Sequence, residues 1–123
     1  MKLRVIWRGQ AVQLNKARVE QVIRKVVKEH GLAGKVEVSV SLVDDKEMAG
    51  LNQRHLGKKG TTDVLSFPLE KEKGPDGVVR LGDVVVSLDQ AERQAKKKKV
   101  SLVEEAEFLV RHGVLHLLGV HHD

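Results

Sequence analysis

The sequence predicts an α+β fold, with a small mixed β-sheet of about four strands packed with four to five helices. Two patterns predict it: segments that alternate apolar and polar residues lie among segments whose apolar residues recur every three to four positions. The resulting order of elements is β-α-β-α-β-β-α-α. A third observation is the length of 123 residues, which suffices for one hydrophobic core. We therefore expect residues 1–123 to form a single domain.

The first half of the chain predicts two strands, each followed by a helix. Residues 2–7 predict a strand, and residues 15–31 predict a helix that begins at a capping asparagine and stops at a glycine. Residues 36–42, VEVSVSL, alternate strictly, as in a strand with one buried face. In residues 44–57, an aspartate and a glutamate three positions later predict the start of a second helix, which another glycine ends.

The second half predicts a hairpin and two helices. Residues 64–69 and 78–86 are largely apolar and are separated by a turn signal, KEKGPDG, so we expect these two strands to pair. Capping serines predict one helix from residue 87 and another over residues 101–118. The lysines at 96–99 lie between these helices. We expect a solvated helix terminus there, with contact to an RNA backbone as the alternative.

Composition indicates a soluble globular protein of the cytosol. Hydrophobic residues make up 41% and charged residues 32%, which argues against disorder, and no apolar run suits a membrane span or a signal peptide. The absence of cysteine excludes disulfides and thiolate metal sites, so a metal must bind through nitrogen or oxygen. The net charge of +5 is compatible with a phosphate-rich partner such as RNA. Because the chain has no tyrosine, one tryptophan and two phenylalanines, we expect backbone and shape contacts to dominate RNA binding rather than base stacking.

The end of the chain, HGVLHLLGVHHD, predicts a metal site. His112 and His116 are four residues apart and so share one face of the predicted helix. Gly119 can adopt the left-handed conformation that reverses the chain, which would bring His122 back to the same point. Three neutral imidazoles suit a single zinc ion and leave one coordination position open, as in catalytic sites, although other divalent metals also bind such ligands. His121 is an alternative, since it could be a fourth ligand or take the place of His122.

The spacing His-x3-His-x2-Gly-x2-His also matches that of the metzincin metalloproteases. Those enzymes carry a glutamate directly after the first histidine, as the general base, and this chain has Gly113 there. Glu105 and Glu107 lie a turn or more before the first histidine, and only Glu105 could face the site. Peptide hydrolysis by that mechanism is therefore disfavoured.

Three motifs together resemble the YbeY family of bacterial metal-dependent endoribonucleases: residues 51–69 (LNQRHLGKKGTTDVLSFPL), residues 81–87 (LGDVVVS) and the histidine-rich tail. The resemblance implies a zinc-dependent endoribonuclease that is specific for single-stranded RNA. It implies action in the cytoplasm on ribosomal RNA and the ribosome, in maturation of the 16S 3′ end and in ribosome quality control. It also implies an α+β fold with the metal at the end of a cleft, and it places the metal ligands on His112, His116 and His122.

Two positions depart from the family pattern. His121 stands where relatives commonly have aspartate, and Leu56 stands where the family has an arginine thought to bind or polarise the phosphate. Neighbouring cations could replace that arginine. The catalytic candidates are Arg54, His55 and Lys58, and the candidates for binding RNA or phosphate are Lys59 and Arg111. Asp63, within a matching motif, would either support the metal ligands or cap a turn.

The expected reaction is attack on a phosphodiester, in which the metal activates a water or polarises a phosphoryl oxygen and nearby cations stabilise the developing charge. The sequence shows no cluster of carboxylates for a second metal. Either water or the RNA 2′-hydroxyl could attack. Two alternatives are a metal-dependent hydrolase of another substrate, and a ribosome-associated binding protein whose metal is structural.

Overall fold

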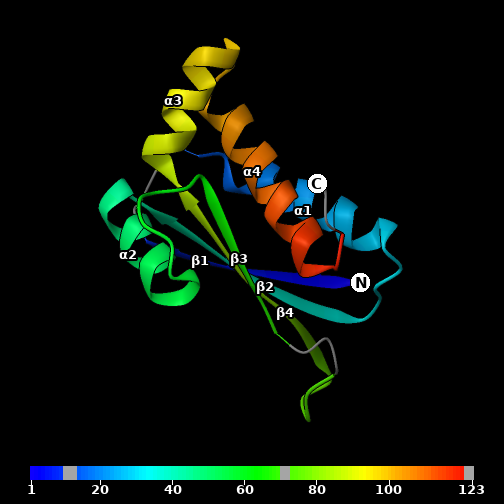
Figure 1. The fold of residues 1–123 in the computed structure, drawn as a ribbon. Helices are drawn as coiled ribbons and strands as arrows, with labels where there is room; N and C mark the ends of the chain where they lie inside the picture. Colours follow the sequence, from blue (N-terminus) through cyan, green and yellow to red (C-terminus); the bar gives the residue numbers. More distant parts are fainter. Residues whose placement is uncertain (10–13, 70–72, 121–123) are drawn as a thin grey trace.

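The computed structural model describes residues 1–9, 14–69 and 73–120 and confirms the predicted order of strands and helices. The sheet has four strands in the order β1-β2-β4-β3 (Figure 1). They are β1 (Lys2–Gly9), β2 (Lys35–Val43), β3 (Val64–Pro68) and β4 (Val78–Ser87). β1, β2 and β4 are parallel, and β3 is antiparallel to β4, which confirms the mixed sheet and the pairing of the last two strands. β1 and β3 are therefore the edge strands of this sheet.

Four helices accompany the strands: α1 (Lys16–Glu29), α2 (Asp45–Leu56), α3 (Leu88–Lys98) and α4 (Leu102–Leu117). Each follows a predicted cap residue, whose side chain accepts a hydrogen bond from the backbone N–H three residues later. These caps are Asn15, Asp44, Ser87 and Ser101. Within the described parts of the chain, none of the helices combines the length and the apolarity that crossing a membrane requires.

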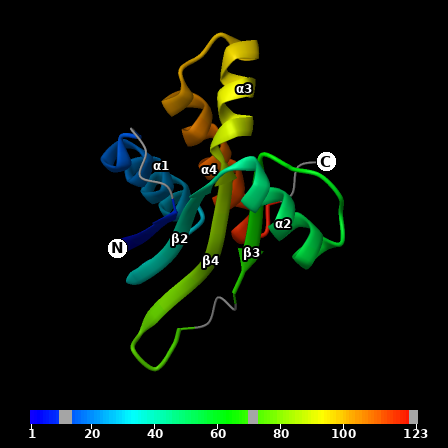
Figure 2. The ribbon, with the colours of Figure 1, turned by 90° about the vertical axis from the view of Figure 1, so that its left-hand side faces the viewer.

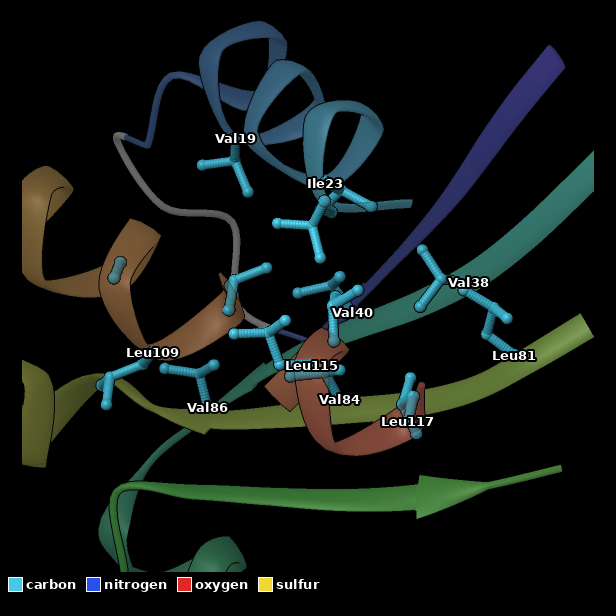
Figure 3. Packing of buried hydrophobic residues seen from close by; sticks show 14 of the residues in the cluster. Val19, Ile23, Val38, Val40, Leu81, Val84, Val86, Leu109, Leu115 and Leu117 are labelled. Atoms are coloured by element: carbon cyan, nitrogen blue, oxygen red, sulfur yellow. The ribbon is translucent and has the colours of Figure 1, made fainter. Parts of the chain in front are cut away.

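The main hydrophobic core lies between one face of the sheet and helices α1 and α4 (Figure 3). Alternate residues of β2 and β4 point into it, among them Val40 and Val84, and the two helices contribute Ile23 and Leu109. On the opposite face, Met48 of α2 packs in a smaller cluster whose other buried members are Val43, Leu65 and Val85. In the side view, α3 stands beyond one end of the sheet, and residues 73–77 project from the other (Figure 2).

Candidate metal centre

Helix α4 presents two of the predicted metal ligands side by side. The ring centroids of His112 and His116 are 4.4 Å apart, with their planes tilted by 50°. Both side chains are half-buried and line a cavity of about 320 Å³. The pairing confirms that the two histidines share a face of the helix, as their spacing predicts. His122, the third predicted ligand, and its alternative His121 lie outside the described residues.

The edge strand β3 forms the facing wall of this cavity. All five of its residues line the cavity, together with Asp63 and Leu56. In β3, the carbonyl of Asp63 accepts from the N–H of Ser87, and the N–H of Leu69 donates to the carbonyl of Leu81. Because backbone groups alternate in direction along an antiparallel strand, the intervening Val64 and Ser66 direct their N–H groups away from β4. β4 therefore does not use the N–H groups of Val64 and Ser66, two residues of the strand that lines the cavity.

Close packing under the histidines explains why position 113 is a glycine. A Cβ atom at Gly113 would lie 2.6 Å from Cγ1 of Val84, which is fully buried in β4. The Gly113 carbonyl also accepts a hydrogen bond from the Ser66 hydroxyl at 3.1 Å. A glutamate at this position would be directed against the sheet, so α4 has no room for the general base of a metzincin protease.

The two glutamates that precede His112 are held in ion pairs elsewhere. Glu105, which is only 1% exposed, accepts hydrogen bonds from the Lys98 ammonium at 2.8 and 3.1 Å. Glu107 pairs with Arg18 of α1. Neither glutamate lines the cavity beside the histidines. The expectation that Glu105 could face the site is therefore not met, because its carboxylate is buried between α3 and α4.

Three of the candidate cations lie in other hollows of the surface. Arg54 lies over Gly50 on the outer side of α2. The His55 ring contacts Phe67 with centroids 5.0 Å apart, in a hollow on the sheet face that α2 covers. Arg111 lines a hollow between α1 and α4. The catalytic roles of Arg54 and His55 and the RNA-binding role of Arg111 stay predictions.

Lys58 and Lys59 lie on a loop between two residues of the cavity wall. Gly57 ends α2 in the left-handed conformation, with φ of 65°, and the exposed lysines follow directly. Leu56 on one side of them and Asp63 on the other both line the cavity. We call this loop, residues 57–60, the rim of the cavity. It carries two exposed lysines next to Leu56, where the resemblance to the family places an arginine.

Side chains of three elements anchor this loop. The Asn52 amide donates to the carbonyl of Gly60 at 3.1 Å, and the Thr61 hydroxyl donates to Asp45 at 3.3 Å. Asp45 also accepts from Arg93 of α3 and from the Ser87 hydroxyl. The hydrogen bond from Arg93, more than the one from Ser87, holds the pKa of Asp45 below its usual value. The loop is therefore fixed to α2 and α3 by polar contacts rather than by apolar packing.

The surroundings of Asp63 are compatible with both roles that its motif leaves open. Its carbonyl takes part in the strand pairing, and its carboxylate accepts from the Gln94 amide at 3.1 Å and from the Thr62 hydroxyl at 3.5 Å. The residue also lines the cavity of the two histidines. The carboxylate is thus oriented by α3 at a position from which it could support a metal ligand.

The donor set fits a metal that prefers nitrogen ligands. Two imidazoles converge in the cavity, and zinc commonly binds such groups together with a carboxylate or a further imidazole. Within residues 1–9, 14–69 and 73–120, no three histidine, aspartate or glutamate side chains form a metal-binding group. The third ligand of a three-histidine site stays a prediction outside these ranges, on His122 or its alternative His121.

Comparisons with known proteins agree in one assignment. The family model described as Endoribonuclease YbeY matches residues 6–123. A protein named Endoribonuclease YbeY from Moorella thermoacetica is 44% identical over an alignment of 113 residues, which covers 85% of this chain and 72% of that protein. The protein of the same name from Aquifex aeolicus is 42% identical over 122 residues, covering 99% of this chain and 79% of its own. A solution structure of a Thermotoga maritima protein superposes with a TM-score of 0.65 at 30% identity, over 98% of this chain and 75% of that one.

Proposed function

This chain belongs to the YbeY family of endoribonucleases, and from that premise we propose that it cleaves single-stranded RNA with the help of one zinc ion. Membership of the family makes the chain an endoribonuclease, a hydrolase that acts on RNA. The requirement for zinc and the preference for single strands belong to the proposal. Other divalent metals that accept imidazole ligands would serve the same site.

The pairing of His112 and His116 inside the cavity carries this proposal. Their rings are 4.4 Å apart and face the edge of β3 across the cavity. An extended RNA chain in this cavity would contact the two histidines on one side and the backbone of β3 on the other. We assign zinc binding to these two side chains and to His122.

The groups on the chain would bind and orient the scissile phosphate. Bound zinc would supply a Lewis acid that polarises a phosphoryl oxygen and favours ionisation of a water molecule. The N–H groups of Val64 and Ser66 are placed to donate to the phosphate oxygens, and Lys58 or Lys59 would neutralise part of its charge. The lysines thereby take the place of the arginine that the family has at Leu56. Either water or the 2′-hydroxyl can be the nucleophile in this arrangement.

Peptide hydrolysis lacks support from the same geometry. Gly113 packs against Val84 where a metzincin protease has its glutamate, and Glu105 and Glu107 are paired with cations away from the cavity. No carboxylate beside the two histidines other than Asp63 is available among the described residues. An RNA substrate carries its own nucleophile, the 2′-hydroxyl, so attack does not depend on a glutamate that activates water.

Cleavage of a labelled single-stranded RNA tests the proposal. We expect cleavage to stop with a chelator, to return with added zinc, and to fall at least about a hundredfold in His116→Ala. His30→Ala is the matched control, because His30 lies at the end of α1 and its Nδ1 contacts the carbonyl of Val26. A deoxyribose substitution at the cleaved position distinguishes the nucleophiles, because only attack by the 2′-hydroxyl would be lost.

Two outcomes would contradict the proposal. If chelation unfolds the protein and no RNA is cleaved in any condition, the metal is structural and the chain is a binding module. If casein is cleaved instead, the peptidase alternative is correct. Zinc content of the purified protein, measured by mass spectrometry, separates zinc from other metals in each case.

In the cell, we propose that the substrate is the 3′ end of immature 16S ribosomal RNA in the cytoplasm, and that the enzyme also acts in ribosome quality control. The resemblance of its motifs to the family and the positive net charge of +5 support a ribosomal partner. Purified immature small subunits should gain the mature 3′ end when incubated with the protein and zinc. An unchanged 3′ end, with cleavage of free RNA intact, would limit the proposal to free RNA.

A further inference from the structure

An exposed aromatic side chain lies one helical turn before the first metal-binding histidine. Phe108 of α4 is 53% exposed, whereas the other two aromatic residues, Trp7 and Phe67, are half-buried. Its ring plane is within 18° of parallel to that of His112, with centroids 6.4 Å apart. An apolar ring is thus displayed to solvent beside His112, which lines the cavity.

Contacts between two helices fix the orientation of this ring. The Lys98 ammonium lies over the Phe108 ring, 4.1 Å from its centroid. Lys98 is itself held by the buried carboxylate of Glu105, through hydrogen bonds of 2.8 and 3.1 Å. α3 and α4 are adjacent in the fold, so both helices position the ring (Figure 1). An aromatic group that is oriented before binding loses less conformational freedom when a ligand contacts it.

We propose that Phe108 is a nucleobase-binding residue: a base of the RNA strand stacks on the part of its ring that Lys98 leaves open. This inference rests on the proposed function and specifies how the same site holds its substrate. Stacking on an aromatic ring suits an enzyme with few sequence requirements, because every base has such a face. The contact would fix which phosphate along the strand reaches His112.

The charges around the ring match a nucleotide better than an apolar protein partner. Lys98 is paired with Glu105, but Lys96, Lys97 and Lys99 at the same end of α3 are exposed. A strand whose base contacts Phe108 would therefore have cations near its phosphates. The small number of aromatic residues predicts little base stacking. Phe108 would supply one stacking contact, next to a proposed metal ligand.

Binding of RNA with single missing bases tests this proposal. Fluorescence anisotropy is measured with a chelator present, so that binding is recorded without cleavage, on a labelled oligoribonucleotide and on a series with one abasic position each. We expect Phe108→Ala to weaken binding of the intact strand about tenfold. The same substitution should have no effect on the strand that lacks the contacted base. Phe108→Trp should bind as the wild type does, and Phe108→Leu should resemble the alanine variant.

Leu69→Ala is the matched control, because Leu69 is also 53% exposed but follows β3 and does not lie on α4 beside His112. It should bind RNA as tightly as the wild type. If the wild type binds and cleaves RNA and Phe108→Ala binds every strand equally well, the inference is wrong and the proposed function stands. An equal loss on all abasic strands would also overturn it, because such a loss indicates a structural role. If the wild type does not bind RNA at all, the proposed function fails together with the inference.

Discussion

The two walls of the cavity are built differently. His112 and His116 lie on a helix that is packed into the main core, and the residues between them, Gly113, Val114 and Leu115, are buried. The opposite rim carries its cations on residues 57–60, which are exposed and are fixed by a few hydrogen bonds. The wall with the two histidines thus depends on core packing, whereas the rim with the two lysines depends on local polar contacts. Substitutions in the first should change stability and activity together, and substitutions in the second should change RNA affinity alone.

The largest effect should come from adding one carbon atom under the histidines. Gly113→Ala places a Cβ atom 2.6 Å from Val84, in a core with no spare volume. Alanine gains about 1 kcal/mol of helix propensity over glycine. We nevertheless expect the free energy of unfolding to fall by roughly 2–3 kcal/mol, because overpacking and a displaced helix cost more than that gain. Thermal and denaturant unfolding, with cleavage measured in parallel, check this.

Val84→Ala supplies the matched second variant. In its background the added methyl group has room, so Gly113→Ala should cost little further stability, and the two substitutions should not be additive. Additive effects would mean that the methyl group does not meet Val84, and would remove the packing argument for the glycine.

A smaller loss of stability should follow from removing the cation over Phe108. Lys98→Ala leaves the carboxylate of Glu105 buried without its ion pair, and we expect the free energy of unfolding to fall by roughly 1–2 kcal/mol, since Lys98 is itself half-exposed. Lys97→Ala, one residue earlier on the exposed side of α3, should change stability little. Adding Glu105→Gln to Lys98→Ala should restore part of the loss. A double variant less stable than Lys98→Ala would show that the burial of charge is not the cause.

On the opposite rim, the lysine pair should affect RNA binding without affecting folding. The combined substitution Lys58→Ala and Lys59→Ala should weaken RNA binding about tenfold and should reduce its dependence on salt concentration. The melting temperature should stay unchanged, because both side chains are exposed. Lys2→Ala with Lys35→Ala, at the paired starts of β1 and β2, is the control of equal charge. Equal losses in the two double variants would indicate that only net charge matters.

The smallest expected effect is a loss of stability in acid that depends on Asp45, the residue that holds Thr61 next to the rim. The pKa of Asp45 lies below its usual value of 3.8, chiefly because Arg93 donates a hydrogen bond to the carboxylate. Folding therefore favours the ionised form of Asp45. The contribution of this carboxylate to the free energy of unfolding is complete above pH 3.8, and it is lost as the pH falls through the lower pKa of the folded state. Hydrogen exchange of residues 58–61 at neutral pH should be faster in Asp45→Asn than in the wild type. On acidification, the variant should lose less stability than the wild type; equal losses would contradict this role of Asp45.

The sequence predicts the features of the fold that depend on local patterns, and misses those that depend on contacts between distant residues. The helix starts at Asn15, Asp44, Ser87 and Ser101 and the pairing of β3 with β4 follow from local patterns, and the structure agrees with them. β1 extends to Gly9, beyond the predicted end at residue 7, because it continues to pair with β2 up to Leu42. That extension depends on a partner strand distant in sequence, which a local pattern does not reveal.

For the site, the spacing of His112 and His116 predicted their shared face, since helix geometry fixes it. Three features depend on tertiary structure and were beyond local patterns. The close contact of Gly113 with Val84 shows that packing requires a glycine where a metzincin has its catalytic glutamate. The ion pair with Lys98 holds the carboxylate of Glu105 away from the two histidines. Phe108 is on the exposed side of α4, although an aromatic residue in a helix is more often expected in the core.

The edge position of β3 in the sheet also bears on self-association. An exposed strand edge can pair with the edge of another molecule and start an aggregate. β3 is only five residues long, and Pro68, whose backbone faces outward, has no N–H to donate. The other edge, β1, carries Lys2, Arg4 and Arg8 at exposed positions, where like charges oppose stacking of copies. Val64 and Ser66 can thus direct their N–H groups toward a nucleic acid, on a strand whose shortness and proline disfavour pairing with a second protein chain.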